Sequence, residues 1–224
     1  MFKKGFTLAE VLITLSIIGI VAALTVPSLV KDFKETQYKI AWKKAFSMAS
    51  QAGLALAAKH DGDLAGVYVT KNTAHENAFV IRKDLERYLG GYVKTCDNCD
   101  QSKKICFPEH KPLNKHSGSV HGSCSGNGSG VSAILKNGMS INMTDPDPAC
   151  GTAPNWICFG IQIDVNGTKG PNITGKDMFE LSINRNGIVR PTGWTKTNNQ
   201  ILTEWSGCHS GGLGWYCSAW YLRQ

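Results

Sequence analysis

The sequence has almost no charge in its longest apolar stretch. Between Phe6 and Val30 only Glu10 is charged, and residues 11–30 carry no charge at all. Twenty helical residues rise about 30 Å at about 1.5 Å each, which matches the hydrocarbon core of a bilayer. We therefore expect residues 6–30 to form a membrane-spanning helix. An unpaired carboxylate in such a helix costs about 2.5–3.5 kcal/mol, so Glu10 requires a partner.

Recognisable enzyme motifs are also missing. The sequence contains no G-x-S-x-G, no H-E-x-x-H and no P-loop, and no two carboxylates are spaced for acid–base catalysis. We therefore expect that this protein is not an enzyme.

The N-terminal residues resemble a processing site of a known kind. Residues 4–10, KGFTLAE, resemble the cleavage site of type IV prepilins and type II secretion pseudopilins, and the likeness is close over residues 3–30. The resemblance implies that a membrane peptidase cuts after Gly5, that Phe6 becomes an N-methylated N-terminus, and that Glu10 pairs with the N-terminal amine of a neighbouring subunit. That pairing suits both groups, because a buried acid and a buried amine satisfy each other where water cannot.

Two simpler interpretations explain less of this segment. A secretory signal peptide has an apolar region of about 7–15 residues followed by a small-x-small cleavage site, and this run is longer. A plain single-pass anchor gives no reason for Glu10 or for the sequence FTLAE.

The resemblance and the charges together predict the organisation of the chain. Residues 1–5 form the leader, residues 6–30 the transmembrane and assembly helix, and residues 31–224 an exported pilin-like domain. Lys3 and Lys4 precede the apolar run, so the positive-inside rule leaves the leader in the cytoplasm and exports the domain. The implied location is the bacterial inner membrane, spanned once, with the C-terminal domain periplasmic or extracellular and a cell-surface filament after assembly. The implied partners are copies of the chain, other pilins or pseudopilins, prepilin peptidase, the inner-membrane assembly platform and the membrane.

The expected fold class is α+β. One long N-terminal helix, membrane-spanning and then amphipathic, is expected to pack on an antiparallel β-sheet domain that disulfides staple. Residues 31–59 continue the helix with one apolar stripe at spacings of four and three. The stripe consists of Tyr38, Trp42, Ala45, Ala49, Ala52 and Leu56.

The remaining elements are read from period and turn signals. Alternating residues around Asn137-Gly138 predict a hairpin over residues 132–143, and further strands are expected at residues 157–165 and 178–184. A short amphipathic helix is expected at residues 78–89, and a long loop at residues 92–130.

All eight cysteines lie in the part that we expect to be exported. They are Cys96, Cys99, Cys106, Cys124, Cys150, Cys158, Cys208 and Cys217. An even number of cysteines in an oxidising compartment predicts disulfides. Spacing does not fix the connectivity, although Cys208 and Cys217 form the clearest local pair. A zinc or redox site at Cys96-x-x-Cys99 is the alternative, but a second ligand pair at regular spacing is missing.

One loop offers hard oxygen donors on a glycine-bent backbone, which suits Ca²⁺. The donors are Asp164, Asn166, Thr168, Asn172 and Asp177. The loop resembles the calcium-holding loop of some major pseudopilins, but it has only two acids and lacks the bidentate glutamate of an EF-hand. The alternative is an Asx-stabilised turn without metal. We expect that no cofactor is required, and calcium is the one that the sequence suggests.

A basic stretch in the long loop suggests a second kind of partner. It consists of Lys103, Lys104, His110, Lys111, Lys115 and His116. Clustered positive charge attracts nucleic-acid phosphates, but interleaved aromatic residues are almost absent. We therefore favour solvated loop residues, including the histidines, over DNA contact. The function expected is a structural pilin or pseudopilin subunit of a type IV pilus or a type II secretion-type filament. The alternative is a minor or competence pilin that binds DNA through this loop.

Overall fold

The computed structural model describes the chain except for residues 1–4, 6, 69–73, 116–127 and 153–154. The chain forms two compact units, residues 1–37 and residues 38–224. Helix α1 (Leu8–Lys59) runs through both units. The second unit contains the other elements of the described chain.

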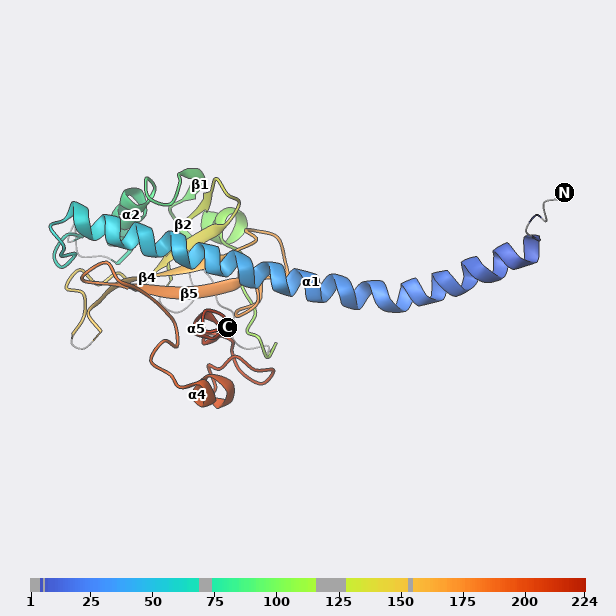
Figure 1. Ribbon diagram of the computed structural model, residues 1–224. Coiled ribbons are helices and arrows are strands. Elements are labelled where there is room, and N and C mark those ends of the chain that lie inside the picture. The colour runs from blue at the N-terminus through green and yellow to red at the C-terminus, as the bar shows by residue number, and fades with distance from the viewer. Residues whose placement is uncertain (1–4, 6, 69–73, 116–127, 153–154) are drawn as a thin grey trace. The chain divides into compact units, whose positions relative to one another are not determined.

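The second unit is built on one antiparallel sheet whose strands follow the order of the chain (Figure 1). The strands are β1 (Tyr92–Cys96), β2 (Gly128–Leu135), β3 (Ser140–Thr144), β4 (Ile157–Asp164), β5 (Met178–Asn184) and β6 (Val189–Pro191). Each strand pairs with the next in antiparallel register. The predicted α+β class is confirmed, as are the strands expected over residues 132–143, 157–165 and 178–184.

Two glycine turns connect neighbouring strands tightly. At the β2–β3 turn the N–H of Leu135 donates to the carbonyl of Met139 at 2.8 Å, and Gly138 has a φ of 87°. At the β5–β6 turn Gly187 has a φ of 74°. Glycine adopts positive φ without the steric cost of a Cβ atom, so Asn-Gly pairs are strong hairpin signals.

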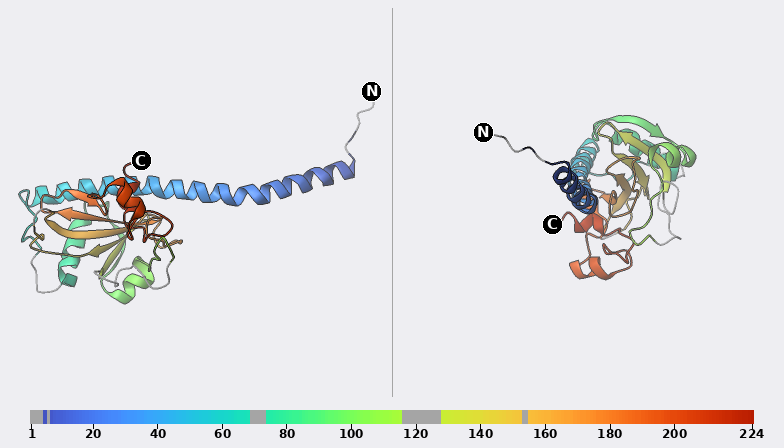
Figure 2. Two further views of the ribbon diagram at one scale, coloured as in Figure 1. Left: turned by 90° about the horizontal axis from the view of Figure 1, so that it is seen from below. Right: turned by 90° about the vertical axis from the view of Figure 1, so that its right-hand side faces the viewer.

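One face of the sheet is apolar and packs against residues 38–59 of α1 (Figure 2). The predicted stripe is confirmed, because Trp42, Ala45, Ala49, Ala52 and Leu56 are buried, while Tyr38 is half-buried. Helix α2 (Ala74–Leu85) adds Ala78, Ile81 and Leu85 to the same core.

Trp42 anchors α1 to this face. Its ring stacks on Phe179 with the centroids 4.7 Å apart, and its Nε1 donates to the carbonyl of Ser218 at 2.9 Å. The indole is fully buried and its single donor is satisfied.

The opposite face of the sheet is polar, and it is buried too. Its buried side chains are Ser132, Ser140, Asn142, Thr144, Gln162 and Asp164. A row of hydrogen bonds crosses three strands: Asn142 Nδ2 donates to Gln162 Oε1, and Gln162 Nε2 donates to Glu180 Oε2, both at 3.1 Å. These bonds satisfy amide groups that would otherwise be costly to bury.

Segments from distant parts of the chain cover the polar face. Helix η1 (Ser102–Cys106) contributes Ser102, whose Oγ lies 2.5 Å from Ser132 Oγ. Helix α5 (Cys217–Trp220) lies beside β5 instead, where the Oγ of Ser218 accepts from the backbone N–H of Glu180 at 3.0 Å and Tyr221 packs against Phe179 on the apolar face.

Helix α2 begins and ends four residues before the predicted 78–89. Residues after Leu85 form a turn instead, in which the N–H of Gly91 donates to the carbonyl of Glu86 at 2.9 Å. Gly90 has a φ of 83°, the conformation expected of a glycine that ends a helix. The α-helix nevertheless ends earlier, at Leu85.

Two further differences concern elements that the sequence did not predict. Strand β1 and the short helices α3 (Cys99–Gln101) and η1 lie within residues 92–130, where we expected a loop. In the C-terminal tail, α4 (Asn198–Thr203) and α5 were not predicted, although Thr197 and Gln200 form a capping box at the start of α4.

The predicted disulfides are confirmed for the described residues. Cys96 bonds to Cys106, Cys150 to Cys158 and Cys208 to Cys217, at sequence separations of 10, 8 and 9. Cys99 is disulfide-bonded as well, and Cys124 lies outside the described residues. No thiol among the described cysteines is free.

Candidate functional site

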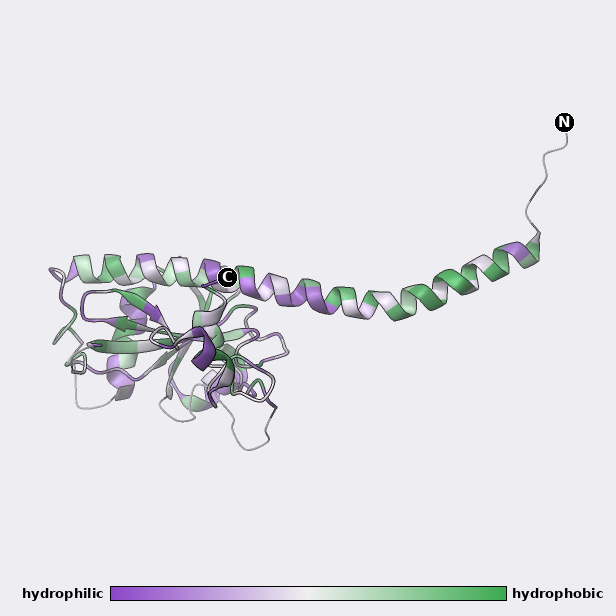
Figure 3. Cartoon of the chain, turned by 60° about the horizontal axis from the view of Figure 1, so that its bottom comes forward, coloured by the Kyte–Doolittle hydropathy of each residue, from purple (hydrophilic) through white to green (hydrophobic). Residues whose placement is uncertain are grey.

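The first unit presents an apolar surface on all sides of a helix. Every side chain from Leu8 to Val30 is exposed except that of Ala22, which is half-buried. Figure 3 shows this part of α1 mostly in the green of apolar residues, with a purple turn near its start. Among the described residues α1 is the one helix long and apolar enough to cross a membrane. An apolar surface of this extent requires lipid or other helices around it.

The hydroxyl side chains within this apolar stretch are satisfied by the helix itself. Ser16 Oγ donates to the carbonyl of Leu12 at 2.8 Å, and Thr25 Oγ1 donates to the carbonyl of Val21 at 2.9 Å. Bonds of this kind remove the cost of placing a hydroxyl in hydrocarbon. Polar groups inside the segment are therefore compatible with a bilayer.

Glu10 forms the most organised polar group at the start of α1. Its Oε2 accepts hydrogen bonds from the backbone N–H and from Oγ1 of Thr7, both at 2.8 Å. Thr7 Oγ1 in turn accepts from the backbone N–H of Glu10 at 3.3 Å. This reciprocal arrangement is a capping box, and it places a carboxylate at the positive end of the helix dipole.

The rest of the predicted processing site is only partly described. Gly5 is exposed ahead of α1, and Phe6 lies outside the described residues. Thr7 was not among the predicted site residues, although the spacing T-x-x-E before an apolar run is the readable signal of a capping box.

The loop proposed for calcium uses its two acids as internal acceptors. Asp177 Oδ1 accepts from the N–H of Ile173 at 2.7 Å, and Oδ2 accepts from the N–H of Asn172 at 2.8 Å. Asp164 Oδ1 accepts from the N–H of Asn166 at 3.1 Å. These bonds are those of an Asx-stabilised turn.

Two other predicted calcium donors of that loop, Asn166 and Thr168, differ in how far they are buried. Asn166 is half-buried, and its Nδ2 donates to the carbonyl of Gly170 at 3.1 Å, while Thr168 is exposed. Among the described residues no group of three or more His, Cys, Asp or Glu side chains is placed to hold a metal ion. All four carboxylate oxygens of Asp164 and Asp177 take part in hydrogen bonds within the protein.

A buried pair joins this loop to the long basic stretch. His110 Nε2 lies 2.7 Å from Asp164 Oδ2, and both side chains are fully buried. Burial lowers the pKa of His110 to about 4 and raises the pKa of Asp164 to about 8. Burial, followed by the charge of Asp164, also raises the pKa of Asp177.

The prediction that the histidines of the basic stretch are solvated is wrong for His110. Residues 107–113 fold back over the polar face of the sheet, and the sequence gives no local signal for this. Lys103 forms an ion pair with Glu109 at 2.8 Å, whereas Lys104, Lys111 and Lys115 are exposed. His116 lies outside the described residues. The basic stretch is therefore a smaller cation cluster than its composition indicates.

Comparison with known proteins identifies the N-terminal segment. Residues 1–26 match the family model of the prokaryotic N-terminal methylation motif. A comparison with curated proteins found no match, and a comparison with solved structures found none either.

The matched motif is the signature of type IV pilins and pseudopilins. It supports a pilin-like or pseudopilin subunit, and it implies processing by prepilin peptidase and assembly with other pilin subunits. Together with the long apolar helix it fits membrane anchoring and a surface filament. The motif belongs to a structural class of proteins rather than to an enzyme class.

Proposed function

We propose that this chain is a structural subunit, a pilin or pseudopilin, of a type IV pilus or a type II secretion-type filament rooted in the inner membrane. Prepilin peptidase removes residues 1–5 and the new N-terminus, Phe6, is methylated. The apolar part of α1 anchors the subunit in the bilayer and then packs with other subunits. The domain of residues 38–224 lies on the periplasmic or extracellular side.

The observation that carries the proposal is the geometry of Glu10 within the methylation motif. Both hydrogen bonds from Thr7 end on Oε2, so within the described residues Oε1 keeps its acceptor capacity. Thr7 therefore orients the Glu10 carboxylate and leaves Oε1 able to accept a further hydrogen bond. The amine of Phe6 in a neighbouring subunit is the charge that fits this acceptor in a low-dielectric setting.

The test is the Glu10→Ala variant in cells that produce the filament. The variant should reach the membrane normally, because the change makes the segment more apolar. Ordered assembly should fail, because the incoming amine loses its counter-charge. Asp32→Ala is the matched control, since Asp32 is an exposed acid of the same helix beyond the apolar run. Normal filaments from Glu10→Ala would contradict the assembly role.

Processing is tested separately by the intact mass of protein extracted from membranes. We expect a chain that begins at Phe6 and carries one methyl group. Recovery of only the chain beginning at Met1, from cells with active prepilin peptidase, would refute processing after Gly5.

DNA binding is the alternative function, and the exposed Lys104, Lys111 and Lys115 support it. A gel-shift titration of the purified chain at rising salt discriminates the two functions. Tight and strongly salt-dependent binding favours a DNA-binding minor pilin, because counterion release dominates such affinities. We expect weak binding, since His110 is buried and Lys103 is paired.

We also propose that the loop of residues 164–177 needs no metal. Backbone N–H groups bind both oxygens of Asp177, and His110 binds Asp164, so the loop is held without a cation. Addition of Ca²⁺ or of a chelator should leave the unfolding temperature unchanged. A saturable upward shift with Ca²⁺, lost in Asp177→Asn, would show that calcium binds there.

A further inference from the structure

An open pocket of about 460 Å³ lies beside the turn that follows α1. It is lined by Asp61, Gly62, Asp63, Trp156, Arg185 and Asn186. These residues come from three segments: the turn after Lys59, the residue before β4, and the β5–β6 turn. The proposed filament function uses none of them. The volume falls in the range of small-molecule sites, which is about 300–1,000 Å³.

The walls of the pocket are tied to one another by backbone hydrogen bonds. The N–H of Leu64 donates to the carbonyl of Arg185 at 2.9 Å, and the N–H of Arg185 donates to the carbonyl of Trp156 at 2.8 Å. The N–H of Gly66 donates to the carbonyl of Pro148 at 2.8 Å. The three segments are therefore held together before any ligand arrives, which lowers the entropic cost of binding.

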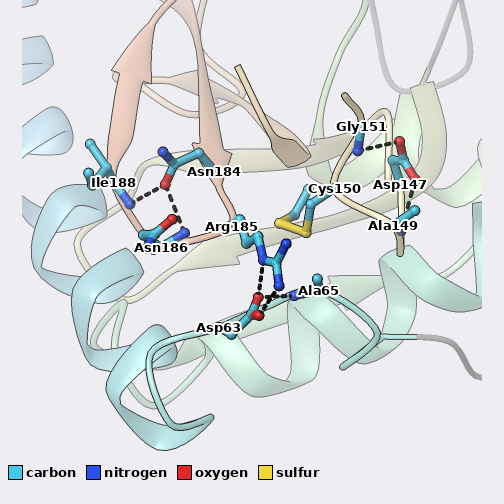
Figure 4. Close-up of a disulfide and its surroundings, with 11 residues drawn as sticks. Asp63, Ala65, Asp147, Ala149, Cys150, Gly151, Asn184, Arg185, Asn186 and Ile188 are labelled. Carbon is cyan, nitrogen blue, oxygen red and sulfur yellow. Dashed lines mark hydrogen bonds and ion pairs between the residues drawn. A yellow bond between two sulfur atoms is a disulfide. The ribbon is translucent and has the colours of Figure 1, made fainter. Parts of the chain in front are cut away.

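A disulfide supports the wall that carries Trp156. Cys150 and Cys158 enclose this residue in sequence, and the N–H of Asp147 donates to the carbonyl of Cys158 at 2.7 Å. Figure 4 shows this disulfide beside Arg185, whose guanidinium points toward Asp63. Trp156 itself has a φ of 47°, a conformation that a bulky residue keeps only when its surroundings hold it.

The charges at the pocket are largely compensated. Arg185 Nε donates to Asp63 Oδ1 at 2.7 Å, and its second nitrogen pairs with Oδ2, so the contact is bidentate. The hydrogen bonds from Arg185 hold the pKa of Asp63 at about 2. The pair therefore stays ionised and nearly neutral overall. Asp61 adds a single exposed carboxylate.

An exposed aromatic ring stands next to these planar polar groups. The side chain of Trp156 is 39% exposed, and the Arg185 guanidinium carbon lies 5.8 Å from its ring centroid. Asn186 is exposed at the rim and offers both an amide donor and an amide acceptor. The pocket thus combines one apolar surface with several directional hydrogen-bonding groups.

We propose that this pocket binds a neutral saccharide. A pyranose ring has an apolar face of C–H groups, which fits against Trp156, and a rim of hydroxyls, which fits the amide of Asn186, the carboxylate of Asp61 and the Asp63–Arg185 pair. A cation fits less well, because the Arg185 guanidinium is already paired with the Asp63 carboxylate and would repel a second positive charge. An anion fits less well, because two carboxylates line the pocket. The chain then carries a glycan-recognition site in addition to its assembly helix.

The test measures binding of three neutral trisaccharides, chitotriose, cellotriose and maltotriose, to the full chain. The protein is kept in a polyoxyethylene detergent, since maltoside detergents carry a competing sugar. Saturation-transfer NMR followed by titration should show at least one ligand with a dissociation constant on the order of 1 mM. Trp156→Ala should weaken that binding about tenfold or more, and Trp156→Phe should weaken it less.

The matched control is Trp205→Ala, which removes an equally accessible indole that is 62% exposed and does not line the pocket. It should leave the affinity unchanged, and near-ultraviolet circular dichroism of each variant checks that it is folded. Asp61→Asn should retain binding, because an amide still accepts a hydrogen bond. The proposal would be overturned if none of the three sugars bound. It would also be overturned if the wild type, Trp156→Phe and Trp156→Ala all bound a sugar with the same affinity. Saturable binding of tetramethylammonium that Asp61→Asn abolishes would overturn it in favour of a cation site.

Discussion

Gly53 of α1 and Gly187 of the β5–β6 turn lie against each other, backbone to backbone. A Cβ atom at Gly53 would overlap the carbonyl oxygen of Gly187, and a Cβ atom at Gly187 would overlap the carbonyl oxygen of Gly53. The helix and the hairpin turn can approach this closely only because neither residue has a side chain. This contact fixes where the sheet sits along the second half of α1.

The first prediction concerns this contact. Gly53→Ala should lower the free energy of unfolding by about 1–3 kcal/mol, because the added methyl group has no space. The sign of the change in unfolding free energy is informative, because helix propensity alone would make Gly53→Ala stabilising by about 1 kcal/mol. Urea unfolding of the full chain in detergent, followed by near-ultraviolet circular dichroism, measures the change. Gln51→Ala, at an exposed position of α1, is the control and should shift stability by less than about 0.5 kcal/mol. Equal stability of wild type and Gly53→Ala would contradict the close approach.

The second prediction concerns Trp42. Trp42→Ala should cost about 3–5 kcal/mol, because a fully buried ring that stacks on Phe179 is lost. Trp42→Phe should cost less, because a ring remains, although the carbonyl of Ser218 loses its donor. The same unfolding measurement applies, and Ile40→Ala on the exposed side of α1 is the control. A larger loss in Ile40→Ala than in Trp42→Ala would show that α1 packs through its other face.

The third prediction concerns pH. Burial raises the pKa of Glu180 from 4.5 to about 7. The folded carboxyl therefore keeps a proton that the unfolded chain has already lost, and stability falls as the pH rises from about 4.5 to about 7. Glu180→Gln has no proton to lose, so its stability should fall less over this range. Asp164, with a pKa of about 8, acts in the same direction and leaves part of the slope in the variant.

The control for the pH measurement is Glu204→Gln. A hydrogen bond from Lys196 lowers the pKa of Glu204, so this residue contributes no loss of stability at rising pH. Unfolding curves at a series of pH values should give a smaller slope for Glu180→Gln alone. Identical slopes for wild type and Glu180→Gln would show that Glu180 is ionised in the folded protein.

The fourth prediction concerns the C-terminal disulfide. Replacing both Cys208 and Cys217 by alanine should lower stability by about 2–3 kcal/mol, because the unfolded chain regains the freedom of a short closed loop. Non-reducing peptide mapping of the wild type should recover this pair and the pairs 96–106 and 150–158. A map that links Cys208 to another cysteine would contradict the structure of the tail.

Local signals account for what could be predicted from the sequence. The stripe from Trp42 to Leu56 and the Asn-Gly turn at 137–138 are short-range patterns, and each was found where it was expected. The methylation motif is local as well, so residues 1–26 identify it without any structure.

The features that were missed depend on contacts between distant residues. Strand β1 forms because β2 pairs with it across a long connection, and its five residues show no alternation. His110 is buried because it meets Asp164, which lies 54 residues later. The pocket at Trp156 draws on three segments, and no spacing in the sequence brings them together. The hydrogen bonds of Asp164 and Asp177 within their loop are likewise visible only in the folded chain.

The order of the strands has a consequence for how a subunit matures. Each strand pairs with the one made just before it, and the three described disulfides join cysteines 8 to 10 residues apart. In the export that we propose, most of the sheet can therefore close as the chain emerges, because few of its pairings wait for distant segments. Trp42 waits for a much later segment, because its acceptor on Ser218 comes 176 residues later. The end of α1 that carries Trp42 is therefore completed last, and we expect a chain cut short before Ser218 to leave the indole N–H of Trp42 without its acceptor.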